Sequence, residues 1–138
     1  MKAITHLAAA AALILGLGGT AIAGDVSPET VDGATTVDTA AARALFDQEA
    51  AFVDTRKDSD FEAGRIPGAI HIELKKKFSE ESLSAEVGKD EPVVFYCNGH
   101  SCLRSSEASK LAVGWGYTKV SYYRDGFPAW KAAGNPVE

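Results

Sequence analysis

The 138-residue chain contains only two cysteines, Cys97 and Cys102, so a framework of several disulfides is excluded. Basic residues are also in the minority, since 14 lysines and arginines stand against 19 acidic residues, for a net charge of -5. The one basic run, residues 75–77, lies beside Phe78 and two glutamates, so we expect it to be a solvated face. Because no longer basic stripe exists, nucleic-acid binding is not expected.

The chain also lacks a long uninterrupted apolar run. After Lys2, an apolar stretch extends from Leu7 to Leu17 and is followed by small residues that end at Ala23. An uncleaved membrane anchor is the rival interpretation, but it needs about 18 or more continuous apolar residues, and glycines interrupt the stretch. We therefore expect residues 1–23 to be a cleaved signal peptide and the mature protein to be periplasmic, with no membrane attachment.

The remaining chain is expected to form one domain. Residues 24–34 contain Ser-Pro and Asp-Gly pairs, and their apolar residues have no periodic spacing that would form part of a core. We therefore expect a flexible, exposed leader there. A chain as long as residues 35–138 buries roughly two-thirds of its unfolded surface on folding, so it does not need disulfide bonds to be stable. Export would place the two cysteines in an oxidising compartment, where a pair bonds by default.

Short apolar runs alternate with helical patterns along the domain. Strands are expected at residues 35–37, 51–54, 69–72, 93–96 and 120–123, and helices at about 39–48, near 79–87 and after the cysteines. The run at 93–96 is apolar throughout, which is typical of a strand in a parallel sheet buried on both faces. Ala108, Leu111, Ala112 and Trp115 have the spacing of one apolar helix face, and both Trp115 and Trp130 are expected in the core. This alternation predicts an α/β fold with a mostly parallel sheet.

Cys97 directly follows the buried strand, at the sheet edge where ligands bind in such folds. The loop from Asn98 to Arg104 must turn into a helix, and Gly99 gives it conformational freedom. Loop amides and the positive end of the helix would favour an anion, first of all an exposed Cys97 thiolate. Lowering a thiol pKa from about 8.5 to about 6 raises the ionised fraction at pH 7 from about 3% to roughly 90%. Arg104 would add a fixed charge if its side chain turns inward.

Four interpretations of the two cysteines remain open at this point. A disulfide between Cys97 and Cys102 would close a short loop and stabilise the fold by only about 2 kcal/mol. The pair can instead be a reversible redox couple, or Cys97 can be a nucleophile. A metal site with His100 as a third ligand lacks a fourth ligand and the usual spacing, so no metal or other cofactor is expected.

Two segments and the cysteine loop together carry a family resemblance. The segments VDTRKDSDFEAGRIPGAIHI and RDGFPAWKAAGNPVE flank FYC and an alanine-containing helix. In this order they resemble the signatures of the rhodanese family, and the likeness covers residues 36–138. It implies a three-layer fold with a five-stranded sheet and helices on both faces.

The same resemblance implies a sulfurtransferase without a cofactor. The catalytic cysteine maps to Cys97, which would carry a persulfide from a donor such as thiosulfate to a thiol or cyanide-like acceptor. The substrate-binding positions map to Arg56 and to the loop residues Asn98, Gly99, His100, Ser101, Cys102, Leu103 and Arg104. Asp54 would fix Arg56 or the loop.

The loop departs from the family pattern. Arg104 lies seven residues after Cys97 rather than five, and the enlarged loop contains Cys102, as in a subset of exported relatives. Arg65 stands where histidine is common. Cys102 could attack a persulfide, so a sulfur-carrier or redox dithiol module serving a periplasmic redox or sulfur-oxidation partner is one alternative. A cysteine phosphatase or arsenate-type site is another.

Overall fold

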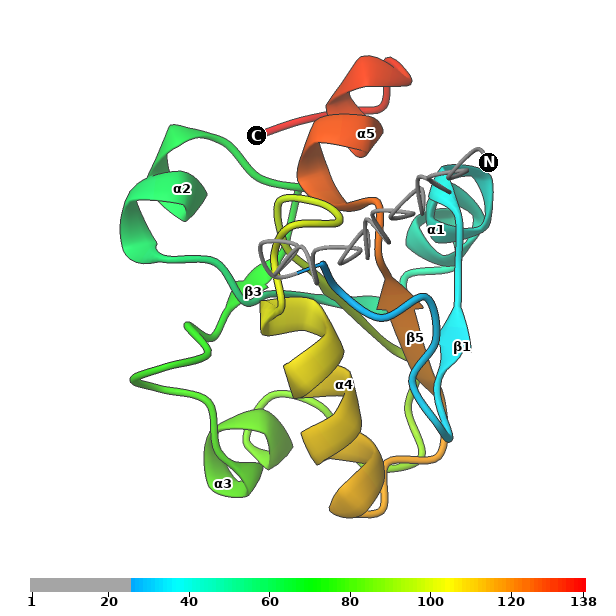
Figure 1. Ribbon diagram of the computed structural model, residues 1–138, viewed down its shortest axis with the longest axis vertical. Helices are drawn as coiled ribbons and strands as arrows, with labels where there is room; N and C mark the ends of the chain where they lie inside the picture. The colour runs from blue at the N-terminus through cyan, green and yellow to red at the C-terminus, as the bar shows by residue number, and fades with distance from the viewer. Residues whose placement is uncertain (1–25) are drawn as a thin grey trace, which may run out of the picture.

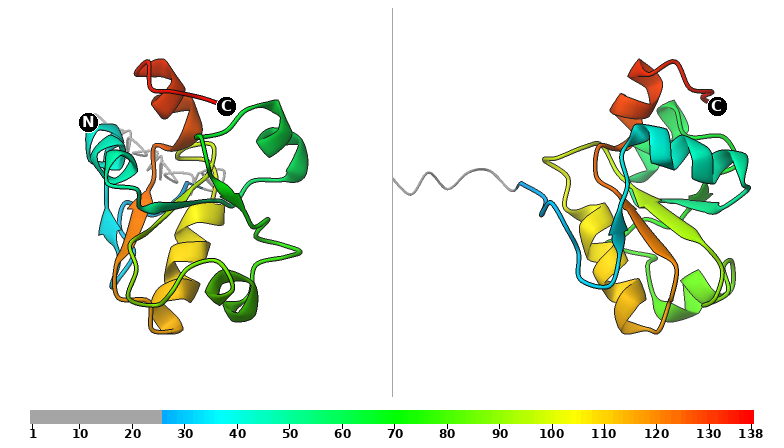
Figure 2. Two further views of the ribbon diagram at one scale, coloured as in Figure 1. Left: turned by 180° about the vertical axis from the view of Figure 1, so that it is seen from behind. Right: turned by 90° about the vertical axis from the view of Figure 1, so that its right-hand side faces the viewer.

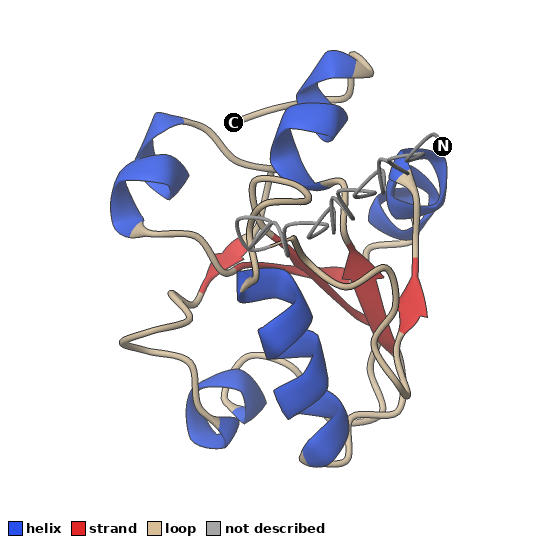
Figure 3. Cartoon of the chain, in the orientation of Figure 1, coloured by secondary structure: helices blue, strands red, loops and turns tan. Residues whose placement is uncertain are grey.

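The computed structural model describes residues 26–138, so the expected signal peptide at residues 1–23 lies outside the described part. A five-stranded sheet in the order β1-β5-β4-β2-β3 forms its centre, and every strand pair is parallel. The strands are β1 (Thr35–Thr36), β2 (Ala51–Asp54), β3 (Ile70–His71), β4 (Val93–Tyr96) and β5 (Val120–Tyr123). Figures 1 and 3 show the strands at the centre of the molecule with the helices around them. The predicted α/β class and the five predicted strands are confirmed.

Helices cover both faces of the sheet. They are α1 (Thr39–Asp47), α2 (Asp58–Ala63), α3 (Glu80–Ser84), α4 (Arg104–Gly114) and α5 (Gly126–Ala132). In β4, Val93 and Phe95 pack with α3 and α4, whereas Val94 and Tyr96 pack with α1 and α5. The right-hand view of Figure 2 shows α4 and α1 on opposite sides of the sheet. The predicted three-layer arrangement is therefore confirmed.

The buried face of α4 differs from the expected one. Ala108 and Ala112 are buried as predicted, but Leu111 is 38% exposed and its place is taken by Ser105 and Ser109. Ser109 can be buried because its hydroxyl donates to the Ser105 carbonyl at 2.7 Å. Small side chains therefore bring α4 close to the sheet.

Residues 26–34 are exposed along most of their length, as expected of a leader, but the stretch contacts the domain at a few points. Ser27 is 2% exposed and Val31 is 9% exposed. The Ser27 amide donates to the His100 carbonyl at 2.7 Å, and the Tyr122 hydroxyl donates to the Pro28 carbonyl at 2.9 Å. These contacts had no signal in the sequence, because they are made by single residues rather than by a periodic apolar face.

Trp130 is fully buried, as expected, whereas Trp115 is only partly buried and stacks on Phe78 with ring centroids 5.5 Å apart. Within residues 26–138, no helix is both long and apolar enough to cross a bilayer.

Candidate active site

The cysteine loop joins the central strand to the longest helix. Cys97 follows the last residue of β4, and α4 begins at Arg104. Gly99 has a φ of 118°, which few residues other than glycine adopt. The conformational freedom expected at Gly99 is therefore needed for the turn. The parallel sheet thus places Cys97 at the carboxyl ends of β2, β4 and β5, as the sequence predicted.

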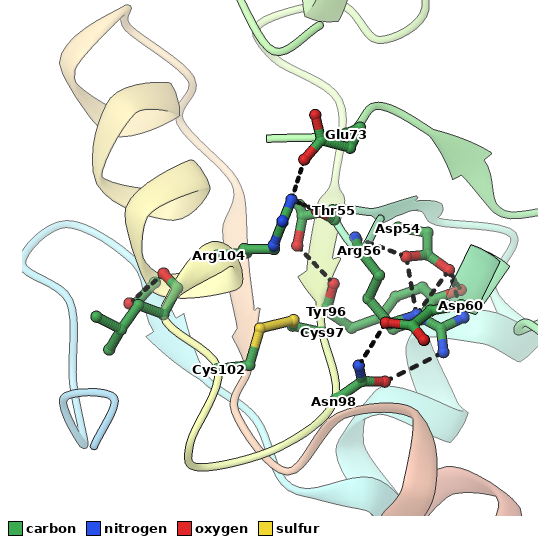
Figure 4. Close-up of a disulfide and its surroundings, with 12 residues drawn as sticks. Asp54, Thr55, Arg56, Asp60, Glu73, Tyr96, Cys97, Asn98, Cys102 and Arg104 are labelled. Carbon is green, nitrogen blue, oxygen red and sulfur yellow. Dashed lines mark hydrogen bonds and ion pairs between the residues drawn. A yellow bond between two sulfur atoms is a disulfide. The ribbon is translucent and has the colours of Figure 1, made fainter. Parts of the chain in front are cut away.

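Cys97 and Cys102 form a disulfide in the structure (Figure 4), with Cα atoms 6.2 Å apart. Cys97 is 1% exposed, because Cys102 and the loop cover its sulfur. Cys97 is therefore not a thiolate in this state of the protein, and the structure shows the bond between the two cysteines that two of the four open interpretations include. The tight turn at Gly99 brings the two sulfurs together, so a nucleophilic thiol exists only after the bond is reduced.

Most backbone amides of the loop and of the first helical turn have no acceptor within residues 26–138. The Cys102 amide donates to the Gly99 carbonyl at 3.0 Å, and the Glu107 amide is the first to enter the helical pattern. No side chain caps the helix at Leu103. The amides of residues 103–106 are left available, as expected for a site that stabilises negative charge next to the cysteines.

Arg56 lies under the loop rather than on its open side. It is 3% exposed, and its guanidinium donates to both carboxylate oxygens of Asp54 at 2.7 to 3.1 Å. It also donates to the Gly64 carbonyl at 2.6 Å and to the side-chain oxygen of Asn98 at 3.2 Å. Arg56 is thus placed to position the loop, as was suggested for Asp54, rather than to contact a substrate.

Asn98 connects this buried group to the loop. Its side-chain nitrogen donates to Asp60 at 3.0 Å while its oxygen accepts from Arg56. Below it, the Tyr96 hydroxyl donates to Asp54 at 2.8 Å. Burial, with the adjacent charge of Asp54, raises the pKa of Tyr96 far above its ordinary value, so this hydroxyl stays protonated.

The same network fixes the charge of Arg56. Burial alone would lower the pKa of Arg56, but the hydrogen bonds and charge of Asp54 raise it. The guanidinium also lies between the rings of Phe127 and Tyr96, at 4.6 and 5.6 Å from their centroids. Arg56 is therefore held in its charged form and is packed between side chains from distant parts of the chain.

Arg104 is half-buried and extends from the start of α4 across the loop (Figure 4). It forms an ion pair with Glu73 and donates to the Thr55 carbonyl at 3.3 Å. Burial alone would raise the pKa of Glu73, but the hydrogen bond from Arg104 and backbone amides lower it. The Arg104 side chain does turn inward, yet an internal carboxylate balances its charge.

His100 connects the outer part of the loop to the domain through its side chain as well as through its carbonyl, which accepts from the Ser27 amide. The ring of His100 lies 2.6 Å from the carboxylate of Asp125, and both side chains are exposed. Ser101 and Leu103 are exposed, and the Ser101 hydroxyl has no hydrogen-bond partner within the described residues. A metal site is not assembled, since both cysteine sulfurs are bonded to each other and residues 26–138 contain no cluster of three or more potential ligands.

Gly126 supports the loop and was not singled out by the sequence analysis. The amide of Phe127 donates to the Cys97 carbonyl at 2.9 Å. A Cβ atom on Gly126, whose φ is 70°, would stand 2.3 Å from that carbonyl oxygen and 2.8 Å from the Gly99 nitrogen. The glycine of the closing segment RDGFPAW was the available signal. Glu73, the partner of Arg104, had no comparable signal because it lies in a stretch without a motif.

Comparison with known proteins identifies relatives across most of the chain. A family model described as "Rhodanese-like domain" matches residues 38–133. The human single-domain sulfurtransferase TSTD1 is 25% identical, with a TM-score of 0.61 over 72% of this chain and 96% of that one. A protein of unknown function from Rhodopseudomonas palustris CGA009, RPA3614, described as a possible tyrosine phosphatase, is 32% identical, with a TM-score of 0.62 over 76% and 85%.

A third similar protein shows the domain in a larger setting. The HTH-type transcriptional regulator Rv0324 of Mycobacterium tuberculosis is 34% identical over 90 residues, which are 65% of this chain and 38% of that protein. The chain spans less than two thirds of the length of the curated relatives it matches.

Proposed function

The chain belongs to the rhodanese-like domain family, and on that premise we propose that it is a sulfurtransferase that works through Cys97 in the reduced protein. The observation that carries the proposal is the position of Cys97, directly after the central strand and beside amides at the start of α4 that have no acceptor within residues 26–138. Similarity to a human single-domain sulfurtransferase supports it.

The first half-reaction loads the enzyme. The reduced Cys97 thiolate attacks the outer sulfur of thiosulfate, the sulfur–sulfur bond of thiosulfate breaks, and sulfite leaves with the electron pair. Cys97 then carries a persulfide anion. Amides of residues 103–106 and the positive end of α4 stabilise the incoming dianion and the persulfide.

The second half-reaction returns the thiolate. A nucleophilic acceptor such as cyanide attacks the terminal sulfur, the bond between the two sulfurs breaks, and Cys97 leaves as thiolate while thiocyanate departs. No cofactor takes part. In this scheme the loop positions the sulfur, and the buried Asp54, Arg56 and Asn98 hold the loop in place.

The location and partners are proposed from the sequence. The basic residue, apolar stretch and small residues that end at Ala23 support export to the periplasm with loss of the signal peptide. In that oxidising compartment a reductant of the dithiol class would be required to open the disulfide between Cys97 and Cys102.

A second candidate function is favoured by the disulfide itself. In a dithiol module, the Cys102 thiol attacks the inner sulfur of the Cys97 persulfide, hydrogen sulfide leaves, and the Cys97–Cys102 disulfide remains. A partner dithiol then reduces this bond and is itself oxidised. Such a protein would release sulfide to a partner rather than transfer sulfur repeatedly to cyanide.

One assay separates these functions. The protein is reduced, freed from reductant and given thiosulfate and cyanide, and we expect thiocyanate in many turnovers and none from Cys97→Ser. Undiminished turnover by Cys97→Ser would remove the proposal. Release of one sulfide per protein, with the disulfide re-formed and no thiocyanate, would favour the dithiol module. In a separate assay, hydrolysis of an aryl phosphate would favour a phosphatase.

A further inference from the structure

A basic hollow lies beside the cysteine loop. It has a volume of about 390 Å³, and Lys57, Lys75, Lys76, Lys77 and Arg104 contribute to its lining. The four lysines are exposed, whereas Arg104 reaches the hollow from the start of α4. The lysine run that the sequence analysis treated as a solvated face therefore borders a concave site.

Five basic and two acidic side chains line this hollow, so the lining has a formal excess of positive charge. Within residues 26–138, none of the four lysine ammonium groups forms an ion pair or a hydrogen bond. Of the acidic groups in the lining, Glu73 is paired with Arg104, and Asp58 lies 3.8 Å from the ring of His71. A site with this excess of positive charge on a chain of net charge -5 is a local feature that attracts negative ligands.

Arg104 connects the hollow with the cysteine loop, although neither cysteine lines the hollow. Arg104 stands two residues after Cys102 and donates to the Thr55 carbonyl, at the carboxyl end of β2. Figure 4 shows its side chain between the disulfide and Glu73. A chain held in the hollow would therefore present its neighbouring residues to Cys97 and Cys102.

We propose that the hollow binds an acidic segment of a partner protein and thereby brings the partner's thiol to the cysteine loop. This docking role rests on the proposed sulfurtransferase function, in which a partner's thiol would accept the sulfur. A volume of about 390 Å³ is more than tenfold the roughly 30 Å³ that one water occupies, so the hollow has room for more than one acidic side chain. The concave shape favours a peptide over the flat surface of a membrane.

Binding of a defined probe tests the assignment. The probe is a fluorescein-labelled peptide that alternates glutamate and serine, and its matched peptide carries glutamine in place of glutamate. The test variant replaces Lys75, Lys76 and Lys77 with glutamine, and the control variant replaces Lys110, Lys119 and Lys131, three exposed lysines elsewhere, so that both lose the same charge. Fluorescence anisotropy is read at low ionic strength, in oxidised and in reduced protein.

We expect the wild type and the control variant to bind the glutamate peptide equally, and the test variant to bind about tenfold more weakly, since exposed charge pairs each contribute modestly. The glutamine peptide should not bind. Equal weakening in both variants, or equal binding of both peptides, would overturn the assignment. Binding only to phosphatidylglycerol vesicles, lost in the test variant, would overturn it in favour of a membrane.

Failure of the docking proposal can be distinguished from failure of the sulfurtransferase proposal. Anisotropy does not depend on turnover, so absent peptide binding with normal thiocyanate formation would overturn this inference alone. Absent thiocyanate formation in wild type, with selective peptide binding, would overturn the transfer activity and support the docking site.

Discussion

Asp54 is the residue on which the buried network under the cysteine loop depends. It accepts hydrogen bonds from Arg56 and from the Tyr96 hydroxyl, and it is fully buried. Sequence placed Asp54 and Arg56 together at a strand end, but it could not tell which side of the loop they would occupy. That depends on Phe127 and Tyr96, which pack around the guanidinium from distant parts of the chain.

Replacing Asp54 with alanine should lower the free energy of unfolding by about 3 to 5 kcal/mol, because it leaves Arg56 as an unpaired buried charge. Urea unfolding of the oxidised protein measures the change. Asp47→Ala is the matched control, since Asp47 pairs with Arg43 on the surface and its loss should cost under about 1 kcal/mol. Similar losses in both variants would contradict the assigned role of Asp54.

Replacing Cys102 with serine should free Cys97 from its disulfide. We expect the variant to form thiocyanate without prior reduction, whereas the wild type should require a reductant. The variant should also lose about 2 kcal/mol of unfolding free energy, since the short loop is no longer cross-linked. Equal activity of the untreated wild type would show that the bond does not limit the site.

Among the elements, the turn that starts α5 controls the loop most directly. Gly126→Ala should destabilise the protein by roughly 3 kcal/mol or more and lower turnover, because the new Cβ meets the Cys97 carbonyl and the positive φ disfavours alanine. Gly134→Ala is the control, since its φ is 79° but nothing lies within 4 Å of a Cβ there. The control should lose about 1 to 2 kcal/mol and keep its activity. Equal losses of activity would contradict the role of Gly126.

Elements with a strong apolar pattern could be predicted from the sequence, and polar or very short ones could not. The strand Val93–Tyr96 has the predicted bounds because it is buried on both faces. Helix α2 was missed, since Asp58–Ala63 has six residues and no buried face. The error at Leu111 arose because buried serines such as Ser109, whose hydroxyl donates to a backbone carbonyl, take the place of apolar residues.

At the scale of the whole molecule, the Glu73–Arg104 pair makes stability depend on pH. The pKa of Glu73 is lower in the folded protein than its ordinary value of 4.5, so its contribution is present above that value and is lost as the pH falls through the folded pKa. Glu73→Gln should therefore be less stable than wild type at pH 7, and the difference should shrink below about pH 4. Urea unfolding of both proteins from pH 3 to pH 7 measures it. A difference that stays constant with pH would contradict this assignment.

The central claim is that reduced Cys97 accepts a sulfur atom, and intact-mass measurement tests it most directly. Reduced protein is treated with thiosulfate and its mass is compared with that of untreated protein and of Cys97→Ser. We expect Cys102→Ser to gain the mass of one sulfur atom, and wild type to gain it or to lose the two hydrogens of a disulfide. No gain in Cys102→Ser, or the same gain in Cys97→Ser, would contradict the claim.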